Sequence, residues 1–361
     1  MKIHRYGLCL GAALLSVTIG GRDLAAEELA KVTLVQTHPV LAIGEEVFLY
    51  AVPKHLGYFK DEGLDVSIQG ANGGTPAAQA LQSGAAQFAT TMPESVLQIR
   101  EQGGDVVAFD DLKRDNGTAI GVLPDSPIHE LRDLKGKTLA GLSWGSGGAK
   151  LVMHMLGELG IGPNDYQRVN VGAGASAAAA LTSKQVDAVI LWDAMFAIME
   201  NGGTKMRYLD VPIQRQMAGF TLATTDSYMK AHPKQVEGYC RAINKALYFT
   251  RTNVSAAVQI ALQEFPSLRT PNVDPAIVEK NSVHIMEAWL AKAETGVPYD
   301  AKTGNLVPER WQFTENYYKG EGMLKGTKPV SEAYTNRFYD ACNNFDRPAV
   351  AAAAKQFGHP S

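Results

Sequence analysis

The feature that most constrains the fold is a pattern of elements that occurs twice along the chain. Residues 31–91 read as strand, polar loop, helix, strand, glycine-rich turn, small-residue helix and strand. Residues 137–193 repeat this order with "KTLAG", "LSWGSGG", "AKLVMHMLGEL", "YQRVNV", "GAGAS", "AAAALTSKQ" and "VDAVILWD". Strands that alternate with helices form parallel sheets with helices on both faces. The sequence therefore predicts two similar α/β domains.

The loops of both halves carry the residues expected to bind a ligand. In doubly wound sheets, ligands bind beyond the carboxyl ends of the strands, where these glycine-rich loops lie. Two connecting segments, "GTAIGVLPDSPIHEL" and "VPIQRQMAGFTLATTDS", lead into and out of the second half. Two crossings are typical of a hinged pair of lobes around one cleft. We expect lobe 1 to comprise residues 31–122 plus 218–346, lobe 2 residues 123–217, and residues 347–361 to form a weakly specified tail.

The N-terminus reads as an export signal. A basic "MKIHRYG" precedes the apolar "LCLGAALLSVTI", which is too short to span a bilayer, and "LAAEE" offers small residues for cleavage. We expect residues 1–26 to be a signal peptide and the mature chain to be an exported, soluble protein. An oxidising compartment would permit a disulfide between Cys240 and Cys342. Cys240 also lies on an apolar helical stripe, where a free thiol is equally at home, so the sequence leaves both states open.

Composition excludes several classes of partner. The chain has 361 residues, 45% of them hydrophobic, and a formal net charge of −3, which is ordinary for a globular protein of two domains. Nothing in this balance suggests nucleic acid. The eight histidines show no metal-binding spacing. We expect no metal and no cofactor, and a monomer.

Two glycine-containing motifs also fit patterns of other functions. "GLSWG" fits the G-x-S-x-G nucleophile elbow of α/β-hydrolases, with Ser143 as nucleophile, but no upstream HGG-type oxyanion motif accompanies it. "GAGASA" fits a dinucleotide-binding fingerprint, with Asp193 near the distance of a ribose-binding acid, but its helix is short for that role. We favour a third interpretation for "GLSWGSGG": a loop whose backbone N–H groups open a helix and hold a ligand oxygen.

Several stretches resemble a known family. "LGYFKDEGLDVSI", "GGTPAAQALQSGAAQFA", "VLPDSPIHELRDLKGKTLAG" and "VDAVILWD" are similar to periplasmic solute-binding proteins of ABC importers. The branch is the one that handles taurine, alkanesulfonates, nitrate and thiamine-type pyrimidines. The resemblance covers about residues 31–346. It implies a two-lobed type II periplasmic-binding-protein fold, two doubly wound sheets joined by a two-crossing hinge, no catalysis, and delivery of a captured solute to ABC permease membrane subunits.

The candidate ligand-binding residues lie on the cleft loops of both halves. Glu94 and Asp193 would accept hydrogen bonds from an amine or ring N–H, Trp144 and Trp192 would cover a ring or alkyl group, and His38 would donate to an anion. The full set is Gln36, Thr37, His38, Gly74, Thr75, Thr91, Glu94, Ser143, Trp144, Gly145, Ser146, Gly147, Trp192 and Asp193.

The function expected from these observations is capture of a small organic solute, nitrogen-containing or sulfonate-like, between the lobes. The enzyme alternative is a secreted serine hydrolase that uses Ser143. A further alternative is a cytosolic-type pyrimidine synthase, which shares the family fold, although the export signal argues against it.

Overall fold

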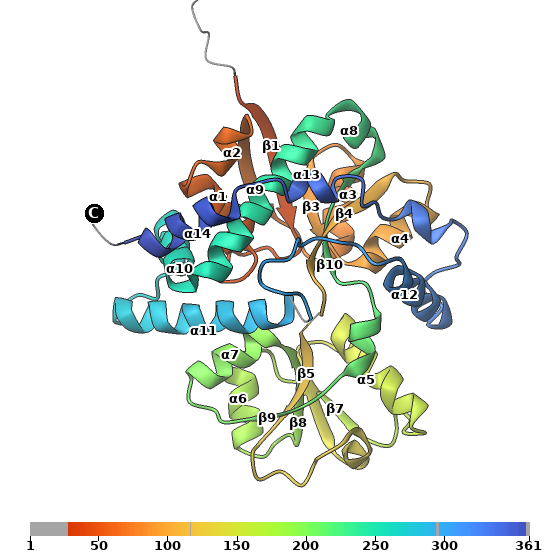
Figure 1. Ribbon diagram of the computed structural model, residues 1–361. Helices are drawn as coiled ribbons and strands as arrows, with labels where there is room; N and C mark the ends of the chain where they lie inside the picture. The colour runs from red at the N-terminus through yellow and green to blue at the C-terminus, as the bar shows by residue number, and fades with distance from the viewer. Residues whose placement is uncertain (1–27, 116, 294–295, 359–361) are drawn as a thin grey trace, which may run out of the picture.

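Two five-stranded sheets form the framework of the protein (Figure 1). The computed structural model describes residues 28–115, 117–293 and 296–358, so the predicted signal peptide lies outside the described residues. The strands of the first sheet are β1 (Ala30–Gln36), β2 (Leu64–Gly70), β3 (Phe88–Thr91), β4 (Val106–Lys113) and β10 (Phe220–Thr225). Those of the second sheet are β5 (Thr118–Val122), β6 (Thr138–Gly141), β7 (Gln167–Asn170), β8 (Ala188–Trp192) and β9 (Arg207–Leu209).

The two sheets share one topology, as the repeated sequence pattern predicts. Their strand orders are β2-β1-β3-β10-β4 and β7-β6-β8-β5-β9. One strand in each sheet corrects the expectation of purely parallel sheets, because β10 is antiparallel to both its neighbours and so is β5. These are the first strands that the chain forms after passing from one sheet to the other, so it enters each sheet running in the opposite direction.

The position of β5 also corrects the first lobe boundary. We expected residues up to 122 to belong to lobe 1, but β5 pairs with β8 and β9 in the second sheet. We therefore propose that the chain passes between lobes after β4 and before β5, and again between Met217 and β10. The local pattern of 118–122 is that of any buried strand, and nothing in it reveals which sheet it joins.

Helices cover both sheets. The longer ones are α3 (Gly74–Gln82), α4 (Pro93–Glu101), α5 (Gly147–Glu158), α6 (Ala175–Thr182), α7 (Asp193–Asn201), α8 (Asp226–Ala231), α9 (Pro233–Thr252), α10 (Val254–Glu264), α11 (Pro275–Ala293), α12 (Pro308–Gly320) and α14 (Arg347–Gln356). Shorter turns are η1 (Val47–Ala51), α1 (Val52–His55), α2 (Tyr58–Asp61), η2 (Leu131–Leu134), η3 (Pro212–Gln216), η4 (Pro266–Leu268), η5 (Val330–Glu332) and α13 (Tyr339–Cys342). Within the described ranges, no helix combines the length and apolar character needed to cross a membrane.

Helix α9 forms much of the core of the first lobe. Its stripe of apolar side chains is buried, and the fully buried Tyr239 stacks on Phe88 with ring centroids 3.9 Å apart. Phe59 stacks on Tyr239 as well. Burial of side chains of this size is the main favourable contribution to folding. The apolar periodicity of the sequence predicts helices at α9 and α10, and both contact η1 beside the first sheet.

The C-terminal segment is well anchored. Cys240 of α9 and Cys342 of α13 form a disulfide, with Cα atoms 5.0 Å apart, which resolves the alternative that the sequence left open. The expectation of a weakly specified tail was wrong for residues 347–356, which form α14. Asp346 caps this helix by accepting a hydrogen bond from the Ala349 N–H, and Val350 and Ala354 are buried against the first core.

Two helices connect the lobes beyond the two crossings. Helix α11 packs against α10 and β4 and also against α7 of the second lobe (Figure 1). Helix α12 packs against α4 and η3, and the carboxylate of Glu321 after it lies 3.1 Å from Nδ1 of His154 on α5. The cleft between the lobes is therefore flanked by a helix at each side.

Candidate ligand-binding site

The cleft between the lobes contains two chambers. The large chamber has a volume of about 830 Å³ and is lined by the loop after β1, the start of α7 and one face of α11. The small chamber has a volume of about 360 Å³ and is lined by the N-terminal turns of α3, α4 and α5 together with Tyr318 and Met323. Figure 1 places α7 and α11 at one side of the lobe boundary and α5 and α12 at the other. Both chambers draw residues from both lobes.

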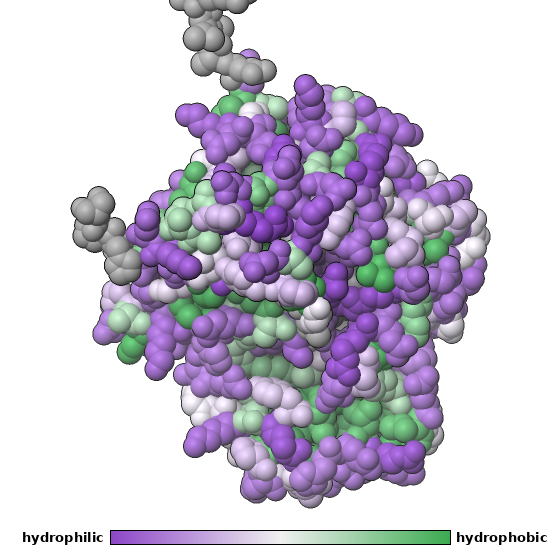
Figure 2. Space-filling model, in the orientation of Figure 1, coloured by the Kyte–Doolittle hydropathy of each residue, from purple (hydrophilic) through white to green (hydrophobic). Residues whose placement is uncertain are grey.

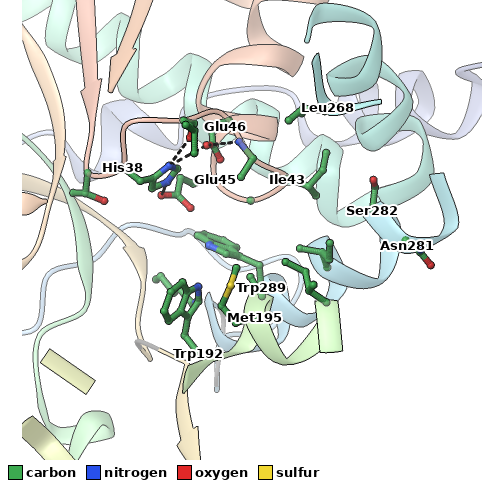
Figure 3. A pocket seen from close by; sticks show the side chains of 18 of the residues that line it. His38, Ile43, Glu45, Glu46, Trp192, Met195, Leu268, Asn281, Ser282 and Trp289 are labelled. Atoms are coloured by element: carbon green, nitrogen blue, oxygen red, sulfur yellow. Dashed lines mark hydrogen bonds and ion pairs between the residues drawn. The ribbon is translucent and has the colours of Figure 1, made fainter. Parts of the chain in front are cut away.

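Apolar side chains form most of the wall of the large chamber. Figure 2 shows hydrophobic side chains within the hollow along the lobe boundary, and Figure 3 shows Trp192, Met195 and Trp289 grouped at the floor of the chamber. The apolar lining residues are Val40, Ala42, Ile43, Met92, Trp192, Ala194, Met195, Ile198, Phe220, Leu268, Val273, Val278, Ile285 and Trp289. A mostly apolar pocket with a few polar groups is typical of sites for small organic molecules.

A histidine held by two carboxylates forms the polar end of this chamber (Figure 3). Nε2 of His38 lies 2.9 Å from a carboxylate oxygen of Glu45, and its Nδ1 lies 2.9 Å from the Val40 carbonyl and 3.4 Å from Glu46. Burial alone would lower the pKa of His38, but the hydrogen bond to Glu45 and the charges of both carboxylates outweigh it and raise the pKa to about 9. Both ring nitrogens therefore carry protons at neutral pH.

The two carboxylates titrate in opposite directions. Burial is the largest single influence and would raise the pKa of Glu45, but the hydrogen bond to His38 and the charges of His38 and Lys113 together lower it, so Glu45 is ionised. Burial, together with the charge of Glu45, raises the pKa of Glu46 to about 8. Ligand atoms of these three residues lie within 4.8 Å of one another, close enough to share a cation. At neutral pH the cluster is instead a satisfied imidazolium–carboxylate pair beside a neutral carboxyl group.

A buried ion pair links the lobes at the chamber. Nζ of Lys113, at the end of β4, lies 2.5 Å from a carboxylate oxygen of Asp193 at the start of α7, and both side chains are only 6% exposed. The same Nζ lies 5.0 Å from the ring centroid of Trp289. Burial raises the pKa of Asp193, and the positive charge of Lys113 opposes this shift. Asp193, predicted to bind a ligand, is thus paired within the protein.

The small chamber is polar. It contains five of the predicted residues: Gly74, Thr75, Glu94, Gly145 and Gly147. Burial raises the pKa of Glu94, and a hydrogen bond from the Tyr318 hydroxyl partly opposes the shift. Lys150 also lines this chamber. Helix N-termini, a cation and a carboxyl group together can hold a small polar molecule.

The predicted residues therefore divide between the two chambers and the surrounding framework. Thr37, His38 and Trp192 line the large chamber, and the five residues above line the small one. Six others line neither: Gln36, Thr91, Ser143, Trp144, Ser146 and Asp193. Loop residues of one half thus reach different parts of the cleft, which the linear pattern does not reveal.

Four of these six residues make hydrogen bonds that shape the framework. Gln36 is buried and donates to the carbonyls of His38 and Val40, and Thr91 bonds Thr221 within the first sheet. Ser143 accepts a hydrogen bond from the Gly145 N–H. Ser146 caps α5 by accepting one from the Ala149 N–H. These hydrogen bonds go to the backbone and to a neighbouring strand, whereas Oε1 of Gln36 is buried without a partner.

Trp144 packs within lobe 2 instead of forming a wall of the cleft. Its ring centroid lies 6.5 Å from that of Tyr166, and the Arg168 guanidinium lies 5.9 Å from the ring. The side chain contacts the buried cluster that also contains Tyr166 and Leu151. The turn at Ser143–Ser146 directs this side chain toward the lobe's own core.

Sequence reasoning missed several lining residues. Glu45, Glu46, Lys113, Met195 and Trp289 all line the large chamber. Glu45 and Glu46 follow His38 in the same loop, so their position in "IGEE" was a usable signal. Lys113 and Trp289 come from distant segments, and no local pattern indicates that they meet.

Comparisons with known proteins place the chain in a family. The model of the family described as "NMT1/THI5 like" matches residues 46–257. The chain belongs to the NMT1/THI5-like family. A curated relative, the 4-amino-5-hydroxymethyl-2-methylpyrimidine phosphate synthase of Aspergillus parasiticus, is 24% identical over 307 residues, covering 80% of this chain and 83% of the relative. A second relative is YtlA of Bacillus subtilis, which is named as a candidate binding protein. It is 24% identical over 276 residues, covering 75% of this chain and 80% of YtlA.

Solved structures show the same two-lobed periplasmic-binding fold. The aliphatic sulphonate binding protein SsuA from Escherichia coli matches with a TM-score of 0.61 and 16% identity, covering 84% of this NMT1/THI5-like chain and 91% of SsuA. The nitrate-binding protein NrtA from Synechocystis PCC 6803 matches with a TM-score of 0.58 and 12% identity, covering 90% of this chain and 91% of NrtA. The predicted fold class and family resemblance are confirmed.

Proposed function

We propose that this protein is the extracytoplasmic solute-binding component of an ABC importer. It captures a small organic solute between its lobes and delivers it to the membrane permease subunits. The observation that carries the proposal is the large chamber, whose wall combines side chains of both lobes with one polar end. The fold of SsuA and NrtA, two periplasmic binding proteins, supports it. We also propose a periplasmic location and a monomer.

The test is a thermal-shift screen of the purified mature protein. Nitrogen-containing and sulfonate-like solutes are the first classes to test, with nitrate, carboxylates, pyrimidines and neutral aromatic compounds as further arms. A solute that binds the folded state raises the melting temperature by mass action. A one-to-one complex confirmed by calorimetry is the expected outcome. If no class shifts the melting temperature, solute capture is the wrong function.

A serine hydrolase is the enzyme alternative, and the surroundings of Ser143 do not favour it. Its hydroxyl is engaged by the Gly145 N–H, and among the described residues no histidine hydrogen-bonds to it. A nucleophilic serine needs an adjacent base. A fluorophosphonate probe separates the two functions: we expect no labelling, whereas stoichiometric labelling of Ser143 would establish the hydrolase.

A further inference from the structure

The charged groups around the large chamber are already paired within the protein. His38 is matched by Glu45 at 2.9 Å, and Lys113 is matched by Asp193 at 2.5 Å. Among the described residues that line this chamber, no other lysine, arginine or histidine is present. An anionic solute would therefore find no unpaired cation, and it would approach the carboxylate of Glu45, which lines the chamber. Its charge would lose hydration without adequate compensation.

The aromatic and sulfur-containing side chains instead provide a wall for an apolar body. Trp289 is 4% exposed and is held in place by Phe48, with ring centroids 4.9 Å apart. Trp192 and Met195 approach from the second lobe and lie next to it (Figure 3). Rigid indole rings and adaptable thioethers bind aromatic molecules well, because both offer large apolar contact areas.

The volume of the large chamber also favours a bulky apolar solute. A chamber of about 830 Å³ lies toward the upper end of the range of about 300–1,000 Å³ for small-molecule sites. An inorganic anion or a two-carbon sulfonate would leave most of this apolar wall in contact with water or empty space. A ring system of two or more fused rings would cover the facing indoles of both lobes.

Resting on the proposed function, we infer that the large chamber selects a neutral solute with a fused aromatic or similarly bulky apolar body, and discriminates against anions of the same shape. The polar end, with Thr37 and the Glu45 carboxylate, accepts a hydrogen bond from a hydroxyl or amide group of the solute. Charge neutrality and an extended apolar surface together define the class.

Three naphthalene derivatives that differ in charge test this inference on the wild-type protein. They are naphthalen-2-ylmethanol, naphthalen-2-ylmethylammonium and naphthalene-2-sulfonate, each titrated by calorimetry. We expect the alcohol to bind at least about tenfold more tightly than either ion. Tighter or equal binding of the sulfonate or of the ammonium compound overturns the inference, and so does failure of the alcohol to bind. Binding of any other solute in the wider screen would then leave solute capture standing.

A pair of methionine variants locates the binding. Met195→Glu places a charge on the wall of the large chamber, whereas Met153→Glu places one on α5, half-buried in the same lobe and outside both chambers. Met195→Glu should weaken binding of the alcohol at least about tenfold, and Met153→Glu should leave it unchanged. Circular dichroism checks that both variants fold. Equal effects of the two variants, or none, contradict binding in the large chamber.

Discussion

At the scale of single residues, the cleft is organised by charges that satisfy one another. Lys113 and Asp193 come from different lobes and are both nearly inaccessible to solvent. A buried pair of this kind is weak evidence for net stability, because desolvation offsets its attraction. Removing one partner, however, leaves an uncompensated buried charge. The ion pair therefore stabilises the contact between β4 and α7.

Lys113→Met should lower the free energy of unfolding by about 3 kcal/mol, the cost of breaking a buried ion pair. Urea denaturation monitored by tryptophan fluorescence measures it. Arg215→Met is the matched control, because its pair with Asp210 is 45% and 56% exposed, and such a pair contributes less than about 1 kcal/mol. Similar losses in the two variants would contradict a special role for the buried pair.

His38 makes stability depend on pH in a defined window. Its pKa is 6.5 in an ordinary environment and about 9 in the folded protein. Between these values the unfolded chain binds fewer protons at His38 than the folded one, so the contribution of His38 to stability is complete below pH 6.5 and is lost as pH rises through 9. Because a third of the imidazole is exposed, we expect a loss of about 2 kcal/mol.

His38→Gln should reduce this decline. Glu46 acts in the same direction, since its raised pKa of about 8 also makes the folded state hold a proton longer, so the variant keeps part of the slope. Unfolding free energies at several pH values from 6 to 9 compare the two proteins. Parallel curves for wild type and variant would show that the imidazolium pair does not form.

Trp144 tests the distinction between framework and site. Its contacts with Tyr166 and Arg168 are internal to lobe 2. Trp144→Ala should therefore lower stability by about 2 kcal/mol, as partial loss of a packed aromatic does, and leave solute affinity unchanged. Calorimetric titration and denaturation of the same preparation give both quantities. A loss of solute affinity with unaltered stability would instead show that Trp144 belongs to the binding site.

At the scale of elements, the backbone immediately before β5 is tightly constrained at Gly117. Gly117 has a φ of +72°, and a Cβ atom there would collide with the carboxylate of Asp193. Glycine is thus required at this position for two reasons, the positive φ of the backbone and the close approach of α7.

Gly117→Ala should destabilise the protein more than Gly136→Ala. Gly136 has a similar φ of +76°, but a Cβ atom added there would meet nothing within 4 Å, so its substitution costs only about 1 kcal/mol of backbone strain. We expect the free energy of unfolding of the Gly117 variant to fall by about 1–3 kcal/mol more, because Asp193 and its ion pair with Lys113 must shift. Urea denaturation of both variants measures the difference. Equal losses would mean that the contact with Asp193 is readily relieved.

The elements also show how far sequence reasoning reaches. The strands of both halves and α9 were predictable, because glycine stops and apolar periodicity are local signals. The antiparallel β5 and the helix α14 were not, because partner choice and burial depend on distant segments. In the site, Thr37, His38 and Trp192, which the sequence suggested as ligand-binding residues, line the large chamber, and their contact with a solute stays a prediction. Asp193 was predicted to bind a ligand from its place at the end of a strand, and its pairing with Lys113 could not be foreseen because Lys113 is distant in the sequence.

At the scale of the whole molecule, the two lobes are joined by more than their crossings. On one side, Nδ1 of His284 in α11 lies 2.8 Å from the side-chain oxygen of Asn201 in α7. On the other, Glu321 contacts His154. These contacts hold the cleft in a conformation in which both lobes face the large chamber. A solute that contacts both lobes would favour this arrangement over one in which the lobes are farther apart.

The most direct test of solute capture between the lobes asks whether binding needs both walls of the cleft. Calorimetry would measure the affinity of the tightest solute from the screen for wild type, Ile43→Glu in lobe 1 and Met195→Glu in lobe 2, both of which place a charge in the large chamber. Capture between the lobes predicts one-to-one binding that each variant weakens at least about tenfold while the fold is retained. Full affinity in either variant would contradict capture between the lobes.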